Sequence, residues 1–174
     1  MTNDEHLRFP IGRFSNLESY ETSETRKNIE QIEALPHHLL KVLEQLSEDE
    51  LAQPYRQGGW TGNQVVHHIA DSHLNCLIRL KLTLTEDNPT IKPYLEERWA
   101  ELSDYSLPLD SAIDLIRATH FKLSNVLKSL HDEDLRRTYV HPQYQYQRDI
   151  SYLVALYAWH GNHHVGHLKL LKKS

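Results

Sequence analysis

Apolar residues recur three and four positions apart along four long stretches of this chain. The clearest stretch runs from Ile29 to Leu46, and the other three lie within residues 62–86, 111–130 and 151–171. This spacing places the apolar side chains on one face of an α-helix. The alternating pattern of a half-buried strand is almost absent. The sequence therefore predicts an all-α fold in which four helices pack their apolar faces together as a four-helix bundle.

Short sequence signals predict where the first helices begin and bend. The segments 47–50 and 61–64 each have Ser or Thr followed three residues later by Glu or Gln, which is the spacing of a capping box. Helices are therefore expected to begin after Ser47 and after Thr61. Pro36 lies inside the first long stretch and should kink that helix, because proline has no backbone N–H and crowds the preceding turn.

The later helices are expected to be joined by irregular segments. Asp110 or Ser111 should cap the third long helix, and Ser151 should begin the fourth. A short helical segment is expected within residues 94–102. Residues 138–149 are expected to form a loop.

A length of 174 residues is enough for one domain with a substantial core, so we expect a single domain over residues 1–174. Residues 1–20 lack a sustained helical period and are broken by Pro10 and Gly12. They are predicted to form an extended arm over the surface of the bundle.

A weak internal repeat relates two connecting regions. The segment VLEQLSEDELAQPY at 42–55 recurs as VLKSLHDEDLRRTY at 126–139. Each copy covers the end of one long helix and the approach to the next, so the repeat predicts two helical hairpins. Independent use of the same capping chemistry after two helices is the alternative explanation.

Charge and cysteine content argue against several classes of function. The formal net charge is -5, which disfavours nucleic acid as a partner because a binding surface has to neutralise phosphates. No apolar run reaches the roughly 18 residues needed to cross a bilayer, and the acidic, polar start is unlike a secretory signal. The single cysteine, Cys76, rules out an internal disulfide and fits a reducing compartment. We therefore expect a cytoplasmic protein with no nucleic-acid or membrane partner.

The histidines of the last long stretch raise the question of a metal site. The chain has 13 histidines, and four of them lie within residues 160–167. Two pairs there are four residues apart, His160/His164 and His163/His167, where chance alone would give about one such pair in a chain of this composition. The spacing by itself decides little, so the case depends on which face of the helix these residues occupy.

Two of these histidines share a helical face with apolar residues. That face comprises Leu153, Tyr157, His160, His164, Leu168 and Leu171. In the second long stretch, His68 lies on an apolar face in the same way. Buried imidazoles need partners for their nitrogens, and one shared metal ion is a solution. The pattern favours His68, His160 and His164 as three ligands of a divalent metal with an open position; histidines packed in an ordinary core are the alternative.

The remaining histidines are given simpler interpretations. His163 and His167 are expected to be neighbours of the site or surface residues. Six others are expected at the surface or in loops: His37, His38, His73, His120, His131 and His141. Asp71, one helical turn after His68, is a candidate to orient a ligand or to accept a proton from metal-bound water. A solvated charge on the helix is the alternative for Asp71.

Several motifs together resemble one known family, the DinB-like four-helix-bundle metalloproteins. Within that family the chain is similar to the YfiT-type metal-dependent hydrolases, which are related to bacillithiol S-transferases. The resemblance covers nearly the whole chain, and the segments that carry it include FPIGRF, PYRQGGWT, GGWTGNQVVHHIADSH, RLKLTLTE, YVHP and YAWHGNHHVGHL.

The resemblance also implies a ligand set. In the family, a Trp precedes the first ligand by eight residues, which matches Trp60 and His68 rather than His67. The last two ligands form a His-x-x-x-His motif, which matches His160 and His164. Many members continue the last ligand with Arg-Gly-Gln, whereas this chain continues with Val-Gly-His, which fits the YfiT-type branch. The resemblance further implies Zn²⁺, with Ni²⁺ as the alternative, together with a homodimer and a cytoplasmic location.

These observations predict an enzyme with two candidate reactions. As a metal-dependent hydrolase, the protein would activate water at the metal to attack a small-molecule substrate. As a bacillithiol S-transferase, it would bind a low-molecular-weight thiol as cosubstrate and activate its thiolate at the same metal. A non-catalytic bundle in which the metal is only a staple is a further alternative. Signatures of zinc proteases, serine hydrolases and phosphate-binding loops are missing from the sequence.

Overall fold

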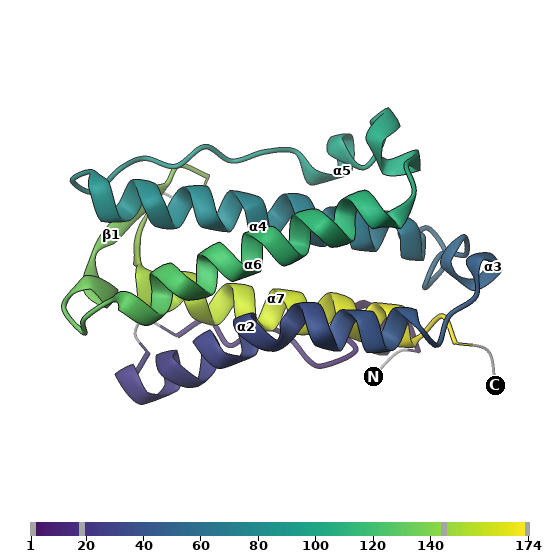
Figure 1. Cartoon of the computed structure of the whole chain (residues 1–174), viewed down its shortest axis with the longest axis horizontal. Coiled ribbons are helices and arrows are strands. Elements are labelled where there is room, and N and C mark those ends of the chain that lie inside the picture. Colours follow the sequence, from purple (N-terminus) through teal and green to yellow (C-terminus); the bar gives the residue numbers. More distant parts are fainter. Residues whose placement is uncertain (1–2, 18–19, 144–145, 173–174) are drawn as a thin grey trace.

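Four long helices form the body of the protein in a computed structural model that describes residues 3–17, 20–143 and 146–172. They lie side by side along the long axis of the molecule (Figure 1), and they are α2 (Thr22–Leu43), α4 (Gly62–Thr85), α6 (Leu109–Ser129) and α7 (Ile150–Lys169). The predicted all-α four-helix bundle is confirmed. No helix among the described residues is both long and apolar enough to cross a bilayer.

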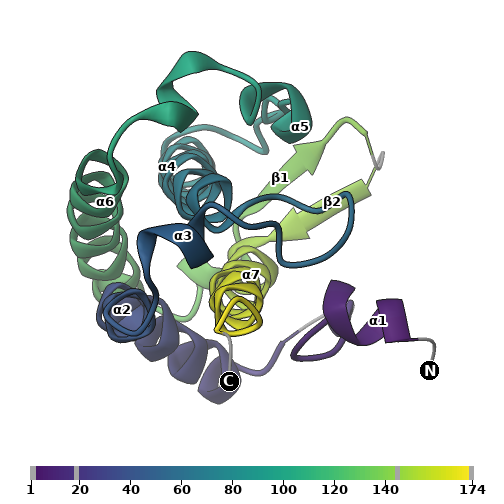
Figure 2. The same ribbon diagram turned by 90° about the vertical axis from the view of Figure 1, so that its right-hand side faces the viewer.

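The helices are not arranged as the two hairpins that the internal repeat suggested. Helix α2 packs against α6 and α7, and α4 packs against the same two helices. Figure 2 shows that α2 and α4 therefore face each other across one diagonal of the bundle, and α6 and α7 across the other. Each copy of the repeat connects two helices that lie on a diagonal. Helices α4 and α6 run in the same direction, because the chain returns along the bundle through the crossover segment 86–108 (Figure 1).

Short elements occupy the connections. These are α3 (Glu48–Leu51), α5 (Glu96–Trp99), the 3₁₀ turns η1 (Ser103–Ser106) and η2 (Asp134–Arg136), and the strands β1 (Thr138–His141) and β2 (Tyr146–Asp149). The loop predicted over 138–149 was wrong, because β1 and β2 pair as an antiparallel hairpin. Strand β1 also pairs with the crossover, since the Ile91 N–H donates to the Val140 carbonyl at 3.0 Å. Strand formation here depends on that partner from a distant segment, which local sequence does not reveal.

The helix starts follow local capping chemistry in most places. The capping boxes predicted at Ser47 and Thr61 are both formed. The prediction for the third long helix was wrong, because α6 has Pro108 as its N-cap and the Ser111 hydroxyl donates to the Pro108 carbonyl at 3.0 Å. Helix α7 begins one residue earlier than predicted, because the Asp149 side chain accepts from the Tyr152 N–H at 2.8 Å and caps it.

The N-terminal segment lies against α7. It contains a short helix, α1 (Asn3–Arg8), where a fully extended arm was expected, and continues without regular structure from Phe9. The Trp159 indole N–H donates to the Gly12 carbonyl at 3.2 Å. The Phe14 ring lies 5.7 Å from the Trp159 ring between centroids. The arm therefore covers part of the helix that carries the His-rich segment.

Pro36 interrupts the hydrogen bonding of α2. Residue 36 would normally donate to the carbonyl of Ile32, four residues earlier, but proline has no N–H. The Ile32 carbonyl instead accepts from the His120 side chain on α6, whose Nδ1 lies 2.6 Å away. The two halves of α2 run in different directions (Figure 2), in agreement with the predicted kink.

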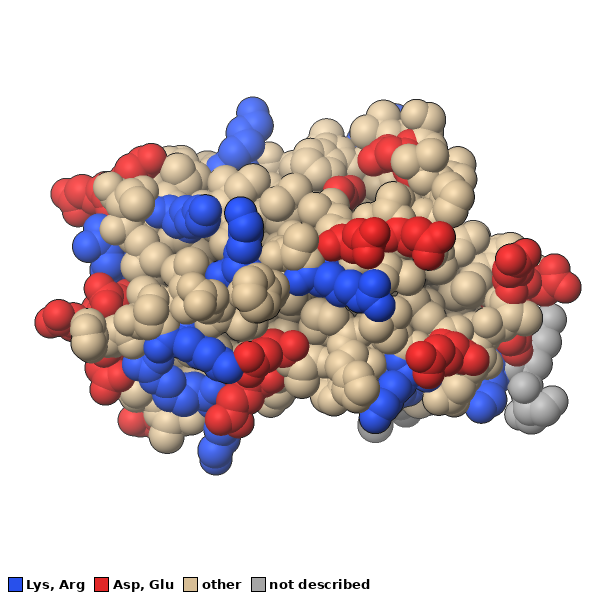
Figure 3. All heavy atoms as spheres, viewed as in Figure 1, with Lys and Arg blue, Asp and Glu red and all other residues tan. Residues whose placement is uncertain are grey.

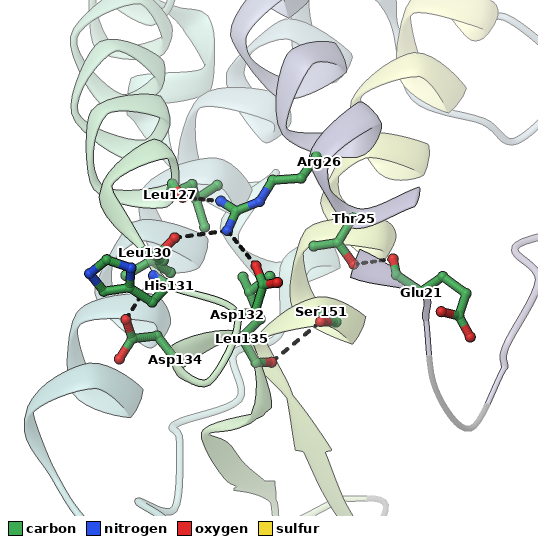
Figure 4. Close-up of polar contacts among 10 residues, drawn as sticks. All are labelled: Glu21, Thr25, Arg26, Leu127, Leu130, His131, Asp132, Asp134, Leu135 and Ser151. Carbon is green, nitrogen blue, oxygen red and sulfur yellow. Dashed lines mark hydrogen bonds and ion pairs between the residues drawn. The ribbon is translucent and has the colours of Figure 1, made fainter. Parts of the chain in front are cut away.

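One end of the bundle is closed by Arg26, near the start of α2. Its guanidinium donates to the Leu130 carbonyl at 2.8 Å and contacts the Asp132 carboxylate at 3.0 Å, at the end of α6 (Figure 4). These contacts satisfy a carbonyl that the end of a helix leaves without an intrahelical partner. On the face shown in Figure 3, basic and acidic side chains are interspersed over the bundle.

Candidate metal centre

Three histidines converge between α4 and α7. His68 lies on α4, and His160 and His164 lie one turn apart on α7. One nitrogen atom of each ring lies within 4.8 Å of the others. The closest pair is His68 Nε2 and His160 Nε2, which are 3.1 Å apart. The structure therefore brings together the three residues that were predicted as ligands.

The position of α7 depends on close helix packing beside the cluster. Gly161 follows His160 directly, and a Cβ atom at Gly161 would lie 2.4 Å from Cδ2 of Leu35 on α2. A side chain at residue 161 would therefore require the Leu35 side chain to move. The glycine therefore lets α7 lie against α2 while its neighbouring face presents His160 and His164 to α4.

Burial keeps the three imidazoles neutral. Burial, and next the nearby His167 ring, lower the pKa of His68 to about 4. Burial and the neighbouring imidazoles also hold the pKa values of His160 and His164 well below the usual range. Metal ligands have to be deprotonated, so these rings have the required charge state at neutral pH without any loss of a proton.

The donor set fits a divalent metal ion. The Nε2 atoms of His68 and His160, 3.1 Å apart, can share a single hydrogen or, when both lack one, a single cation. In tetrahedral zinc sites with Zn–N bonds of about 2.0–2.1 Å, ligand nitrogens are about 3.3 Å apart. No carboxylate or thiolate from the described part of the chain joins the cluster. Three nitrogen ligands leave at least one coordination position open, as in catalytic zinc sites.

A cavity of about 670 Å³ opens beside the cluster, and all three histidines line it. Aromatic side chains form much of its wall, namely Trp60, Tyr94, Tyr139, Tyr152, Tyr157 and Trp159. The crossover 86–108 and the β1–β2 hairpin supply the wall opposite α7. A cavity of this size and lining is typical of a site for a small molecule.

The cavity also contains a guanidinium group. Arg79 of α4 donates to the Tyr157 hydroxyl at 3.1 Å and to the Lys92 carbonyl at 3.3 Å. Burial raises the pKa of Tyr157, so its hydroxyl stays protonated at neutral pH. Arg79 therefore ties the crossover to α4 and places a permanent positive charge on the cavity wall.

Two histidines that were predicted at the surface are fully buried. His73 on α4 is 0% exposed and His120 on α6 is 1% exposed, so that prediction was wrong. The His73 ring lies beside the cluster, with its Nε2 3.3 Å from His160 Nδ1. A sequence signal for both was present. His73 continues an apolar stripe through Val66, Ile69 and Leu80, and His120 continues one through Ile116, Leu123 and Leu127.

Seven further histidines lie in different environments. His163 and His167 are buried neighbours of the cluster rather than surface residues. His67 is turned away from it, with Nε2 3.1 Å from the Leu107 carbonyl. His141 is partly buried and lines the cavity. As predicted, three are exposed: His37, His38 and His131.

Asp71 does not join the cluster. Its carboxylate accepts from the Tyr105 hydroxyl of η1 at 2.8 Å, and it is not among the residues that line the cavity. Burial raises the pKa of Asp71, while the hydrogen bond from Tyr105 opposes that change. The geometry gives Asp71 a role in holding η1 against α4, and its part in proton transfer stays a prediction.

Comparison with known proteins agrees with this architecture. The family model of the DinB superfamily matches residues 31–168. A Bacillus cereus (strain G9842) protein named "Putative metal-dependent hydrolase" is 47% identical over 167 residues, which cover 96% of each chain. A protein of the same name from Bacillus cereus ATCC 10987 is 46% identical over the same share.

A solved structure shows the same fold. YfiT from Bacillus subtilis, described as "a probable metal-dependent hydrolase with an unusual four-helix bundle topology", matches with a TM-score of 0.91. It is 37% identical, and the match covers 95% of each chain.

Proposed function

This chain belongs to the DinB superfamily, and we propose that it is a metal-dependent hydrolase in which His68, His160 and His164 hold a divalent ion, Zn²⁺ by preference. The observation that carries the proposal is the convergence of three neutral imidazoles on the wall of a cavity. The names of the relatives from Bacillus cereus and of YfiT support metal dependence and hydrolysis.

The protein contributes metal ligands, aromatic side chains on the cavity wall and a positive charge. An ion held by three neutral imidazoles supplies Lewis acidity and water activated near neutral pH. Trp60 packs on His68, with 4.6 Å between ring centroids, and limits the directions from which solvent can reach that ligand. Arg79, which donates to Tyr157 one turn before His160, provides a cation on the cavity wall and favours a substrate with a polar or anionic group. The aromatic side chains favour a substrate with apolar parts as well.

Metal content and turnover test the proposal together. We expect purified protein to bind about one divalent ion per chain. It should hydrolyse at least one member of a panel of small esters and amides, lose that activity with a chelator, and regain it with Zn²⁺. The same preparation should be offered bacillithiol and an electrophile such as monochlorobimane. Thiol conjugation without any hydrolysis would replace the hydrolase proposal with the S-transferase.

A variant separates a catalytic ion from a structural staple. If His160→Ala abolishes metal binding and hydrolysis while the melting temperature stays within a few degrees, the site is functional. A large fall in melting temperature on metal removal would instead favour the non-catalytic bundle. The homodimer and the cytoplasmic location remain proposals that rest on the family resemblance, and light scattering of the purified protein tests the first.

A further inference from the structure

Each metal-ligand candidate on α7 contacts a second histidine through its Nδ1 atom. His160 Nδ1 lies 3.3 Å from His73 Nε2. His164 Nδ1 lies 3.3 Å from His167 Nδ1. His73 and His167 are 0% and 2% exposed, so water does not compete for these contacts. The hydrogen positions in such pairs follow from what the outer histidine binds on its other side.

The outer contact of His167 determines its tautomer. Its Nε2 lies 3.2 Å from the Arg8 carbonyl at the end of α1, and a carbonyl can only accept. His167 Nε2 therefore carries the hydrogen. The ring is 2% exposed, and as a neutral imidazole with its hydrogen on Nε2 it has a free lone pair on Nδ1. That lone pair can accept the Nδ1 hydrogen of His164, which leaves His164 Nε2 bare for a metal.

The contacts that lead to His160 begin at Pro36. Because Pro36 lacks an N–H, the Ile32 carbonyl is free to accept from His120 Nδ1 at 2.6 Å. The hydrogen of His120 is thus on Nδ1, and burial lowers its pKa to about 4, so its Nε2 is a bare acceptor. The His120 ring stacks on His73 with 4.8 Å between centroids.

His73 then has two tautomers to choose between. Its Nδ1 and the Nε2 of His120 are both buried and have no hydrogen-bond partner among the described residues. A metal bound through His160 Nε2 would place the hydrogen of that neutral ring on its Nδ1. His73 Nε2, 3.3 Å away, then accepts this hydrogen, so the hydrogen of His73 is on its own Nδ1.

We propose that His73 and His167 are positioning residues for the metal centre. Each accepts the Nδ1 hydrogen of a ligand histidine and so directs the ligand's Nε2 lone pair toward the ion. The Arg8 carbonyl of the N-terminal segment holds His167 in place. His73 stacks on His120, and His120 binds the Ile32 carbonyl of α2, which is free because Pro36 has no N–H. This inference rests on the proposed metal site and adds the residues that set its geometry.

Metal affinity of matched variants tests the role of His73. His73→Leu removes the acceptor, and we expect Zn²⁺ affinity, measured by competition with a chromophoric chelator, to fall about 10- to 100-fold. His73→Gln keeps an acceptor near the position of Nε2 and should recover most of that loss. His67→Leu removes another buried histidine of α4, whose ring is turned away from the three metal-binding histidines. It should leave the Zn²⁺ affinity unchanged. A purely structural role would make the Leu and Gln variants equal in affinity.

The arm and the proline provide two further variants. His167→Leu should weaken Zn²⁺ binding, while His167→Asn, which keeps an acceptor at the position of Nδ1, should bind more tightly than the Leu variant. Pro36→Ala restores an N–H that competes with His120 for the Ile32 carbonyl. It should weaken Zn²⁺ binding severalfold without lowering the stability of the metal-free protein. Unchanged affinity in His73→Leu and His167→Leu would overturn the positioning role alone.

Ring ¹⁵N chemical shifts of the Zn²⁺-loaded protein report the tautomers directly. We expect hydrogens on Nδ1 of His160, His164, His73 and His120, and on Nε2 of His167. A hydrogen on Nε2 of His73 would overturn the inference for His160 even if the metal binds. Wild-type protein that binds no Zn²⁺ would overturn the proposed function and the positioning role together.

Discussion

Two regions of the bundle satisfy their polar groups in different ways. At the Arg26 end, a guanidinium, helix-end carbonyls and a carboxylate satisfy one another (Figure 4). Between α4 and α7, Nε2 of His68 lies 3.1 Å from Nε2 of His160, and His164 presents a nitrogen to the same position. The first region is complete with the polypeptide alone. In the second, one cation can take the place of a hydrogen bond between neutral rings, which is how a binding site differs from a structural contact.

The two regions should therefore respond differently to substitution. Hydrogen bonds of the kind made by Arg26 typically contribute about 0.5–1.5 kcal/mol each to stability, more when a charge is involved. The contact between the neutral imidazoles of His68 and His160 is at most a hydrogen bond without charge assistance, so it contributes less to the stability of the metal-free protein. Stability should thus depend on the Arg26 end, and metal binding on the three histidines.

The largest effect is expected from His160→Ala. Loss of one of three ligands should reduce Zn²⁺ affinity by more than the roughly 10- to 100-fold typical of groups outside the coordination sphere. The free energy of unfolding of the metal-free protein should change by less than about 1.5 kcal/mol, because the contacts of His160 with His68 and His73 are at most hydrogen bonds between neutral rings. Chelator competition and urea titration measure the two quantities. A large fall in stability with metal binding intact would reverse the contrast between the regions.

Acid should lower the free energy of unfolding through the buried histidines. The pKa values of His68 and His120 are lowered to about 4, against about 6.5 for an unfolded chain. Between these values the unfolded state binds protons that the folded state does not. Their stabilisation is therefore complete above about pH 6.5, and it is lost as the pH falls toward 4, by up to about 1.4 kcal/mol per pH unit for each ring.

Urea titrations of metal-free protein at about pH 7, 6 and 5 measure this loss. His120→Leu should reduce the change in unfolding free energy between about pH 7 and 5. His38→Ala, at an exposed position, is a control that should leave this change unaltered. Stability that is constant down to about pH 5 would show that these rings are not held neutral by the fold.

A smaller effect is expected from Arg26→Ala. Its side chain is 35% exposed, so solvent weakens its contacts, and we expect a loss of about 1–2 kcal/mol in unfolding free energy. Zn²⁺ affinity should stay the same. Arg117→Ala removes an exposed contact with Asp114 at 3.5 Å and should cost less than about 0.5 kcal/mol. Weaker metal binding in Arg26→Ala would show that the two regions are coupled.

The smallest effect is expected from Asp71→Asn. The amide keeps an oxygen that accepts from the Tyr105 hydroxyl, so hydrolysis should stay within about threefold of the wild-type rate. Steady-state kinetics on the substrate identified by the ester and amide panel measure this change. A loss of about 100-fold or more would instead support the predicted role of Asp71 in proton transfer.

Features encoded within one helix were predictable from the sequence. The apolar periodicity located the long helices, and the capping boxes at Ser47 and Thr61 located two starts. The placement of His160 and His164 on one face of α7 also followed from their spacing. The diagonal connections did not follow, because the direction of the crossover depends on packing among all four helices. The β1–β2 hairpin was missed for a similar reason, since β1 binds the crossover.

The residues that surround the three metal-binding histidines could be identified only from the folded structure. His73 and His120 lie on different helices and meet only because α4 packs on α6. The contact of His167 with Arg8 joins residues at opposite ends of the chain. Pro36 could be recognised as a kink, whereas the identity of the group that binds the freed Ile32 carbonyl depended on the position of α6.

The crossover 86–108 has a consequence for how such proteins diversify. The three histidines belong to the long helices, whereas Tyr94 and its neighbours on the cavity wall belong to a connection between them. Insertions or substitutions in that connection can reshape the chamber and change which compounds are accepted, while the chelating triad stays in place. Over evolutionary time, substrate specificity can therefore change independently of the reaction chemistry.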